Sequence, residues 1–333
     1  MKDLKLTCPL CGGKTVLLHS QVGDYYFGAP GNWDIYQCKA SACGVAAPLP
    51  SPDEAVLEQA YNCYYTHGSA ENRGADYLKA LLARLSYLGC PSSDLPLGAR
   101  WPILGRLLEN GRLATGSIRP HSNGVIADIG CGSGDRLTLL ARSGWGRTVG
   151  VDPDPAAVAA GMRQGRRLIQ GSAEALPWPD SLLDAAMMHH VLEHVRHPSI
   201  ALDEAFRTLK PGGQITVLTP NVNSETHLHR GPYWRGLEVP RHLTVFSLDA
   251  LVKLVRGAGF VVDIARSSAR SGAWNEAESS RAETGTTSAA SLLSRYWFAD
   301  ALYRHQSKTI ASGQEIGDEL LVVAHRPLNI DES

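Results

Sequence analysis

The amino-acid sequence predicts an α/β protein built on a doubly wound parallel β-sheet, with a small cysteine-rich module in front of it. From Val125 onward, short apolar stretches alternate with segments of helical periodicity, which is typical of a parallel sheet with helices on both faces. Four of the seven cysteines lie within the first 43 residues. At about 100–200 residues per domain, a chain of 333 residues allows one large domain with smaller appendages.

The N-terminal cysteines form two closely spaced pairs. Cys8 and Cys11 make a C-x2-C pair, and Cys38 and Cys43 make a C-x4-C pair further on. Four thiolates on two tight turns suit a structural, tetrahedral zinc ion with no position left open for catalysis. Unliganded core thiols or a redox pair are the alternatives, although a redox C-x2-C belongs in a βαβ pattern that is absent here. We therefore expect a zinc ribbon over residues 1–50, built on a hairpin of two or three strands.

Composition divides the rest of the chain into two regions. A Pro-rich linker at 46–53 is followed by helical periodicity, which predicts a helical linker or cap region over residues 51–120, with helices at 54–65, 75–88 and 102–110. The main domain then spans residues 121–333. Within it, residues 268–291 are rich in Ser, Ala, Thr and Gly, so we expect a partly mobile surface insertion over 268–316.

Seven strands alternate with helices in the main domain. The strands are expected at 125–130, 148–152, 167–171, within 181–190, and at 214–221, 260–267 and 318–326. The intervening helices are expected at 135–143, 155–164, 199–209 and 247–257. Sheets of this kind bind their ligands at the carboxyl ends of the strands, so the residues that follow each strand are the first candidates for a site.

A glycine turn follows the first of these strands. Gly130, Gly132 and Gly134 read G-x-G-x-G, whereas the dinucleotide fingerprint is G-x-G-x-x-G. Glycines let the backbone approach a ligand closely, and Asp152 ends the next strand, where a carboxylate can accept both hydroxyls of a ribose. No lysine follows the turn to bind a phosphate, so the turn is not a P-loop.

With these residues the chain resembles the class I S-adenosylmethionine (SAM)-dependent methyltransferases, over roughly residues 123–326. ADIGCGSG and GVDPDP are similar to the family's first two motifs, and GSAEALPWPD resembles its adenine-side motif. HHVLEHV is similar to the helix after the fourth strand, and LKPGG to the turn before the fifth. The resemblance implies a Rossmann-like fold and SAM as the cofactor.

The same resemblance implies which residues hold the cofactor. Asp152 would bind the ribose diol, and Ala173 would offer its backbone N–H to adenine beside Ser172, where the family often has Asp. Tyr65 would cover the methionine end of SAM or pack the N-terminal helix. The methionine and ribose part would be cradled by Asp128, Gly130, Gly132 and Gly134.

Residues 219–247 are dense in His, Arg, Tyr and Trp, which predicts the acceptor side of the site. They resemble an insertion in a bacterial subgroup, the methyltransferases of polysaccharide, sugar and ubiquinone-type pathways. The matching residues are Asn221, Ser224, Tyr233, Trp234, Glu238, Arg241, His242 and Phe246. From this pattern we expect Tyr233, Trp234 and Arg241 to bind the acceptor, although a salt bridge from Arg241 to Glu238 is the structural alternative.

Two histidines are candidates for proton transfer. His242 could act as a general base, because histidine titrates near neutrality, or it could orient the loop or bind the substrate. His190 ends the fourth strand on the ligand-facing edge, while His189 is expected on the other face. Methyl transfer from a sulfonium depends mainly on alignment, so a base is needed only where the acceptor must lose a proton.

The sequence thus predicts a SAM-dependent methyltransferase that acts on a small-molecule acceptor, such as a sugar, a nucleotide-linked sugar or a secondary-metabolite precursor, with O-transfer as the default. A net charge of −1 argues against nucleic-acid binding as the main role. The alternatives are a ribosomal RNA methyltransferase with a zinc ribbon and a non-catalytic SAM-binding scaffold. No apolar run approaches the ~18 residues of a membrane span, and no secretion signal is read at the start, so we expect a cytoplasmic protein. The sequence makes no prediction of oligomeric state.

Overall fold

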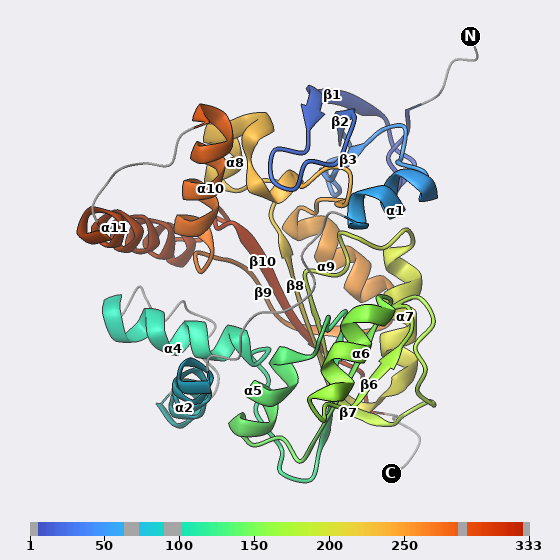
Figure 1. Ribbon diagram of the computed structural model, residues 1–333, viewed down its shortest axis with the longest axis vertical. Coiled ribbons are helices and arrows are strands. Elements are labelled where there is room, and N and C mark those ends of the chain that lie inside the picture. Colours follow the sequence, from blue (N-terminus) through green and yellow to red (C-terminus); the bar gives the residue numbers. More distant parts are fainter. Residues whose placement is uncertain (1–5, 63–72, 90–101, 286–291, 329–333) are drawn as a thin grey trace. The chain divides into compact units, whose positions relative to one another are not determined.

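The computed structural model describes residues 6–62, 73–89, 102–285 and 292–328 (Figure 1). Its contacts divide the chain into two compact units. The first unit consists of Met1–Tyr64, Thr219–Leu251 and Arg266–Leu320, and the second of Tyr65–Leu218, Val252–Ala265 and Leu321–Ser333. The predicted boundaries at residues 50 and 120 differ from this division, because the cysteine module is grouped with two segments that lie far along the chain.

A seven-stranded sheet forms the framework of the main domain, in the order β6-β5-β4-β7-β8-β10-β9. Its strands are β4 (Val125–Ile129), β5 (Arg147–Asp152), β6 (Leu168–Gln170), β7 (Leu183–His189), β8 (Leu209–Pro220), β9 (Val261–Ser268) and β10 (Glu319–His325). Parallel pairing joins β4 to β5 and β7, β5 to β6, and β7 to β8. The chain leaves β4 toward β5 and returns to its other side at β7, and a reversal of this kind is where doubly wound sheets bind ligands.

Helices α2 (Arg73–Gly89) and α4 (Pro102–Ala114) lie in the predicted cap region, and α2 packs against α4 and α5. The helices that flank the sheet, as the sequence predicts, are α5 (Asp135–Ser143), α6 (Pro155–Arg163), α7 (Pro198–Thr208) and α9 (Leu248–Gly257). Figure 1 shows α5 and α7 on opposite sides of the strands. The start of α6 is typical of their local chemistry. The Asp154 side chain accepts hydrogen bonds from the N–H groups of Ala156 and Ala157, and proline occupies the first helical position.

The LKPGG segment departs from its predicted turn. It lies inside β8, where Leu183 pairs with Leu209 while Ala185 already pairs with Gln214. The residues between are accommodated as an irregularity of the strand, and Gly212 has a φ of +77°, a value that glycine adopts without strain. The predicted strand at 214–221 therefore begins earlier than expected.

The first unit contains the cysteine module and its neighbours. Strands β1 (Thr15–Gly23), β2 (Asn32–Cys38) and β3 (Ala46–Pro48) form an antiparallel sheet in that order. Helix α1 (Glu54–Asn62) follows, and the later segments supply α8 (Glu225–Arg230), the 3-10 turns η1 (Gly231–Tyr233) and η2 (Arg235–Leu237), α10 (Gly272–Thr284) and α11 (Leu292–Ala311). We call β1–β3 with the cysteine turns the ribbon, and residues 221–247 the acceptor-side segment.

The amino-acid composition did not predict the two helices that follow β9. Residues 268–316 were expected to be a surface insertion, yet α10 and α11 occupy most of this range. Helix α10 buries small polar side chains, such as Asn275 and Ser279, which composition alone predicts to be exposed to solvent.

Tyr65, Cys63 and Cys90 lie outside the described residues. Among those that are described, no helix has the length and apolar character needed to cross a bilayer.

Candidate functional site

The turn after β4 has a backbone that requires glycine. Gly130, Gly132 and Gly134 have φ values of +70°, +55° and +79°, in the left-handed region that other residues avoid. A Cβ on Gly130 would lie 2.5 Å from a methyl carbon of Val191. The N–H of Gly130 donates to the carbonyl of Val151 at 2.8 Å, which ties the turn to β5.

Two carboxylates lie beside this turn. The Asp128 side chain is almost fully buried, and its Oδ1 accepts from Arg136 at 3.2 Å. Its Oδ2 has no hydrogen-bond partner among the described residues, and burial raises the pKa of this carboxyl against the opposing effect of Arg136. Asp152 is also buried, and its two oxygens accept the N–H groups of Gly132 (2.7 Å) and Asp154 (3.0 Å). The glycine cradle and the unpartnered Oδ2 fit a ligand that approaches the backbone and donates hydrogen bonds, as the ribose and methionine parts of SAM do.

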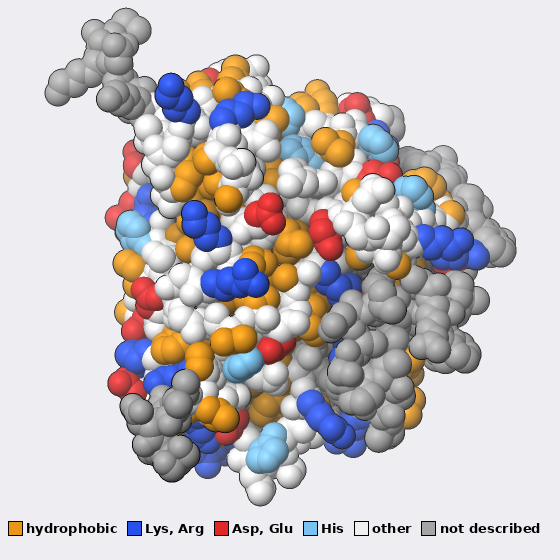
Figure 2. Space-filling view, turned by 180° about the vertical axis from the view of Figure 1, so that it is seen from behind, with side chains coloured by type: hydrophobic (Ala, Val, Ile, Leu, Met, Phe, Trp, Pro, Cys, Tyr) orange, Lys and Arg blue, Asp and Glu red, His pale blue; other side chains and the backbone are white. Residues whose placement is uncertain are grey.

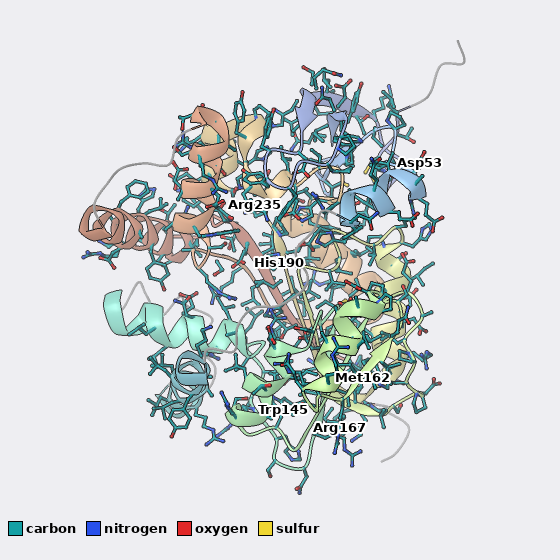
Figure 3. All side chains as sticks on the ribbon, viewed as in Figure 1. Asp53, Trp145, Met162, Arg167, His190 and Arg235 are labelled. Carbon is teal, nitrogen blue, oxygen red and sulfur yellow. The ribbon has the colours of Figure 1, made fainter. Side chains whose placement is uncertain are left out.

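His190 directly follows β7 (Figure 3). Its φ is +56°, which is uncommon for a non-glycine residue and is one of the strained conformations that cluster at active sites. The side chain is 43% exposed, and its Nδ1 lies 3.1 Å from Oε1 of the buried Glu193. The neighbouring His189 is buried. His190 thus lies at the carboxyl edge of the sheet with an exposed imidazole and an oriented ring.

The predicted adenine-side residues follow β6. Ser172 is exposed, and its hydroxyl accepts the N–H of Glu174 at 3.1 Å, while Ala173 is buried.

The second unit also has a pocket of about 280 Å³ at the amino ends of the strands, at the opposite edge of the sheet from the glycine turn. It is lined by residues that include His121, Trp145, Asp184 and Lys210, none of which was predicted to bind the cofactor.

Comparison with known proteins agrees with the geometry of the glycine turn. A family model described as a methyltransferase domain matches residues 106–263. Residues 106–263 are therefore similar to a methyltransferase domain. The turn after β4, Asp152 at the end of β5 and His190 at the end of β7 all lie within the matched residues, and SAM is the cofactor of this family.

Individual relatives match only part of the chain. A protein named "Probable S-adenosylmethionine-dependent methyltransferase" from Mycolicibacterium smegmatis is 31% identical over 41% of this chain and 52% of its own length. A ubiquinone/menaquinone biosynthesis C-methyltransferase from Roseobacter denitrificans is 32% identical over 30% of this chain and 44% of its own length. The chain therefore spans about half the length of these relatives. A solved SAM-dependent methyltransferase from Archaeoglobus fulgidus covers 66% of this chain and 94% of its own, at 19% identity and a TM-score of 0.46.

The predicted acceptor-binding side chains are mostly enclosed by protein. Trp234 is 0% exposed, and its Nε1 donates to Asp318 at 3.0 Å. Arg241 is also 0% exposed and forms an ion pair with Asp24 at 2.7 Å. Glu238, the structural alternative as a partner of Arg241, forms an ion pair with Arg235. The prediction that Trp234 and Arg241 contact the acceptor is therefore corrected: both side chains are used to hold the first unit together.

Tyr233 and His242 have different surroundings. Tyr233 is partly exposed, and its carbonyl accepts the hydroxyl of Tyr26 at 2.6 Å. His242 is buried, and its Nδ1 lies 2.8 Å from the carbonyl oxygen of Gly236. This contact requires the proton on Nδ1 and so orients the ring, which supports the loop-orienting role that the sequence left open.

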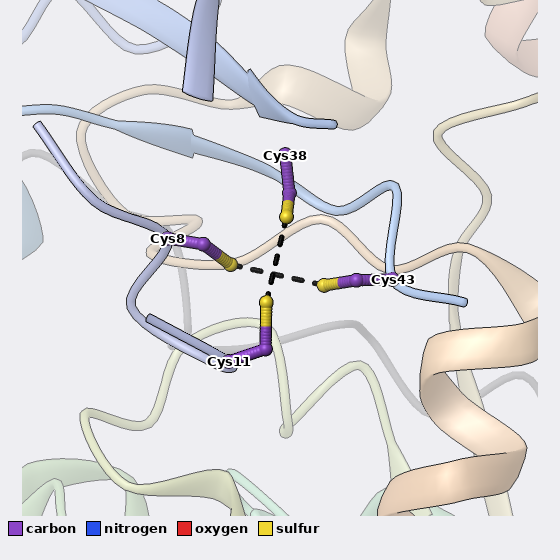
Figure 4. A group of neighbouring side chains, drawn as sticks. All are labelled: Cys8, Cys11, Cys38 and Cys43. Atoms are coloured by element: carbon purple, nitrogen blue, oxygen red, sulfur yellow. Dashed lines mark hydrogen bonds between the residues drawn. The ribbon is translucent and has the colours of Figure 1, made fainter. Parts of the chain in front are cut away.

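The four N-terminal cysteines converge on one point (Figure 4). Their sulfur atoms all lie within 4.8 Å of one another, with Cys8 and Cys43 at 3.7 Å and Cys11 and Cys38 at 3.5 Å. Zinc–sulfur bonds of about 2.3 Å in a tetrahedron place neighbouring sulfurs about 3.8 Å apart. The arrangement therefore fits a four-coordinate zinc ion.

Sequence reasoning missed a buried polar centre in the first unit. Asp318 is 0% exposed and accepts from Trp234 and, at 2.8 Å, from the hydroxyl of Thr226, and burial raises its pKa to about 6. His227 stacks on Trp234 with ring centroids 4.6 Å apart, and its Nε2 lies 3.0 Å from that of His19. Burial lowers the pKa of His19 to about 4, and His227 adds to the shift. The sequence signal for this centre is the adjacent acidic pair Asp318 and Glu319 at the start of the predicted last strand.

The glycine turn can be tested by one methyl group. Gly130→Ala is expected to destabilise the second unit by about 1–2 kcal/mol through its left-handed backbone, and to weaken SAM binding because the added Cβ meets Val191. Gly165→Ala is the matched control, since Gly165 has a φ of +79° but nothing within 4 Å of its Cβ. Thermal unfolding and SAM titration measure the two effects. Equal SAM affinity in both variants would contradict the assignment of this turn.

Proposed function

We propose that this protein is a SAM-dependent methyltransferase that acts on a small-molecule acceptor. The observation that carries the proposal is the glycine turn after β4, with Asp152 at the end of β5, inside the residues that match a methyltransferase domain. The proposal includes a structural zinc ion in the ribbon and a cytoplasmic location, where thiolate ligands stay reduced.

In this proposal, the glycine turn and the residues around it each bind a defined part of SAM. The carboxylate of Asp152 accepts the two ribose hydroxyls, and the glycine backbone lets the methionine part approach β4. Oδ2 of Asp128 accepts a further hydrogen bond, and the N–H of Ala173 donates to adenine beside Ser172. SAM supplies an electrophilic methyl group on a sulfonium, so the protein contributes mainly by aligning the acceptor with it.

His190 is the stronger candidate for removing a proton from the acceptor. Its imidazole is 43% exposed and Glu193 orients its Nδ1, so Nε2 is the atom that would accept the proton. His242, which is buried and bonded to Gly236, is assigned to orienting its loop. Tyr233 remains as the predicted acceptor contact of the acceptor-side segment.

A sugar, a nucleotide-linked sugar or a secondary-metabolite precursor is the proposed acceptor, with O-transfer as the default. C-transfer is the second candidate, because a relative carries the name of a C-methyltransferase. On the face in Figure 2, Lys and Arg side chains are interspersed with Asp and Glu rather than gathered into one basic surface. The net charge of −1 favours a small molecule over ribosomal RNA, since binding to a nucleic acid depends on a basic face.

Methyl-labelled SAM tests the proposal directly. We would incubate the purified protein with labelled SAM and an extract of the source cells, and then separate acid-soluble from acid-insoluble label. Label in soluble product supports a small-molecule acceptor, and mass spectrometry of the product shows whether O or C is methylated. Nuclease-sensitive insoluble label would replace this reading with the RNA alternative. SAM binding without transfer in any extract would favour the scaffold alternative.

A single carboxylate should control SAM affinity. Asp152→Asn is expected to raise the dissociation constant for SAM about 10- to 100-fold, because each hydrogen bond to a charged group is worth about 1.5–3 kcal/mol. Asp203→Asn, at an exposed position of α7, is the matched control and should bind SAM as the parent does. Calorimetric titration measures both. An Asp152→Asn affinity within twofold of the control would refute the role of this residue.

A further inference from the structure

We propose that the cysteine ribbon is a positioning element for the acceptor side: it holds residues 221–247 in their conformation, and so controls methyl transfer without contributing to SAM binding. The inference rests on the proposed function for the assignment of residues 221–247 to the acceptor. It assigns the ribbon a role other than recruiting a separate partner. All the contacts that support it lie within the first unit.

The backbone of the acceptor-side segment pairs with the ribbon. The N–H of Ala46, in β3, donates to the carbonyl of Val245 at 2.9 Å, and the N–H of Val245 donates back to Ala46 at 2.7 Å. Two residues on, the hydroxyl of Ser247 donates to the carbonyl of Cys43, one of the four cysteines that fit a zinc ion. The end of the segment is thus held by an element whose own geometry the metal would determine.

A buried ion pair joins the two parts a second time. Asp24 follows β1, and its Oδ2 lies 2.7 Å from Nη2 of Arg241, with both side chains 0% exposed. Asp24 also accepts the N–H groups of Tyr26, Phe27 and Ala29 at 2.9–3.1 Å. Burial alone would raise the pKa of Asp24, but the hydrogen bonds from Arg241 and these backbone groups lower it. A charge this deeply buried is tolerated only beside its partner, so the turn of the ribbon and the loop at Arg241 stabilise each other.

Side chains of the ribbon fill the remaining interface. The guanidinium of Arg235 lies 4.5 Å from the ring centroid of Tyr26 and 5.0 Å from that of Phe27. The imidazoles of His19 and His227 meet at 3.0 Å. A single apolar cluster contains both ribbon and segment residues: Val22, Ile35, Ala46, Val222, Trp234, Leu237, Val239 and Val245. Because neither part has this core without the other, we expect them to fold as one cooperative unit.

Two carboxylates of the ribbon provide a matched pair of variants. Asp24→Asn removes the charge that Arg241 needs. Asp34→Asn changes a carboxylate of the same ribbon whose Oδ1 accepts from the backbone and side-chain N–H groups of Gln21. Hydrogen–deuterium exchange of peptides covering residues 231–247 is the primary measurement, and SAM titration reports on the second unit.

Asp24→Asn is expected to speed exchange in residues 231–247 about tenfold or more, since local opening sets the exchange rate, with SAM affinity unchanged. Asp34→Asn should leave both unchanged. Adding Arg241→Met to Asp24→Asn should restore part of the protection, because the second change removes the buried positive charge that has lost the Asp24 carboxylate. If each substitution only removed a separate stabilising contact, the loss of protection from exchange would instead grow with the second substitution.

The inference is overturned if Asp24→Asn and Asp34→Asn exchange alike in residues 231–247, or if Asp24→Asn weakens SAM binding as much as it speeds exchange. A drop in labelled product from Asp24→Asn at unchanged SAM affinity further supports it. The exchange result does not depend on finding an acceptor. Failure of the parent protein to transfer methyl groups would therefore refute the proposed function, while the coupling of ribbon and segment would still be decided.

Discussion

Removal of the metal from the four-cysteine site is expected to unfold the ribbon and to expose residues 221–247, with SAM binding retained. A ribbon of three short strands has little core of its own, and structural zinc contributes an apparent ~10–16 kcal/mol to the folding of comparable peptides. The four sulfur atoms lie within 4.8 Å of one another, and two of their separations, 3.7 and 3.5 Å, are close to the tetrahedral value, so we expect one zinc ion per chain. Elemental analysis before and after chelation, combined with limited proteolysis, measures the effect.

Restoring zinc to the chelated protein is the control for this experiment. Protease resistance of both the ribbon and the acceptor-side segment should return with the metal, because the Ser247 hydroxyl bonds the carbonyl of Cys43 and Val245 pairs with Ala46. Unchanged resistance of residues 6–48 after complete loss of zinc would contradict a structural role for the metal. Cleavage confined to the ribbon would show that the segment keeps its conformation alone.

Local sequence patterns were enough to predict the glycine turn. Three glycines within five residues predict a tight turn, and the left-handed φ values of Gly130, Gly132 and Gly134 are of the kind that such a turn needs, because a glycine turn depends on neighbours along the chain. The same holds for the cysteine pairs, whose spacing defines two turns before any long-range contact forms. The irregularity inside β8 was missed, because a Pro-Gly-Gly run is compatible with a turn and with an interrupted strand.

Long-range partners could not be predicted in this way. Arg241 was assigned to an acceptor because a cation in an aromatic-rich loop suits an anion, but its partner Asp24 lies 217 positions away. Helix α10 was missed for a related reason: the burial of Asn275 and Ser279 depends on the fold around them. Composition measures only the average environment of a residue type.

Truncation of Trp234 is expected to cost the first unit about 3–5 kcal/mol, the usual range for a buried aromatic side chain changed to alanine. The side chain is 0% exposed, stacks on His227 and donates to Asp318, so Trp234→Ala removes packing and a hydrogen bond together. Trp274→Ala is the matched control, because Trp274 is 56% exposed in the same unit and should change stability by no more than ~1 kcal/mol. Urea unfolding of the two variants measures the difference, and equal stabilities would contradict the described packing.

Trp234→Phe separates the hydrogen bond from the packing. It keeps most of the aromatic packing but leaves Asp318 without one hydrogen-bond donor, which should lower the free energy of unfolding by about 1–3 kcal/mol near pH 7.5.

The pKa of Asp318 is raised to about 6 in the folded protein, with burial as the main cause, above its ordinary value of ~3.9. The folded state therefore binds the proton more tightly than the unfolded state, and ionisation of Asp318 destabilises the fold as the pH rises through 4 to 6. At pH 5 this carboxyl is largely protonated and needs the indole donor less, so the cost of Trp234→Phe should be smaller there than at pH 7.5. A cost that is the same at both pH values would show that the Trp234–Asp318 hydrogen bond does not stabilise the ionised carboxylate.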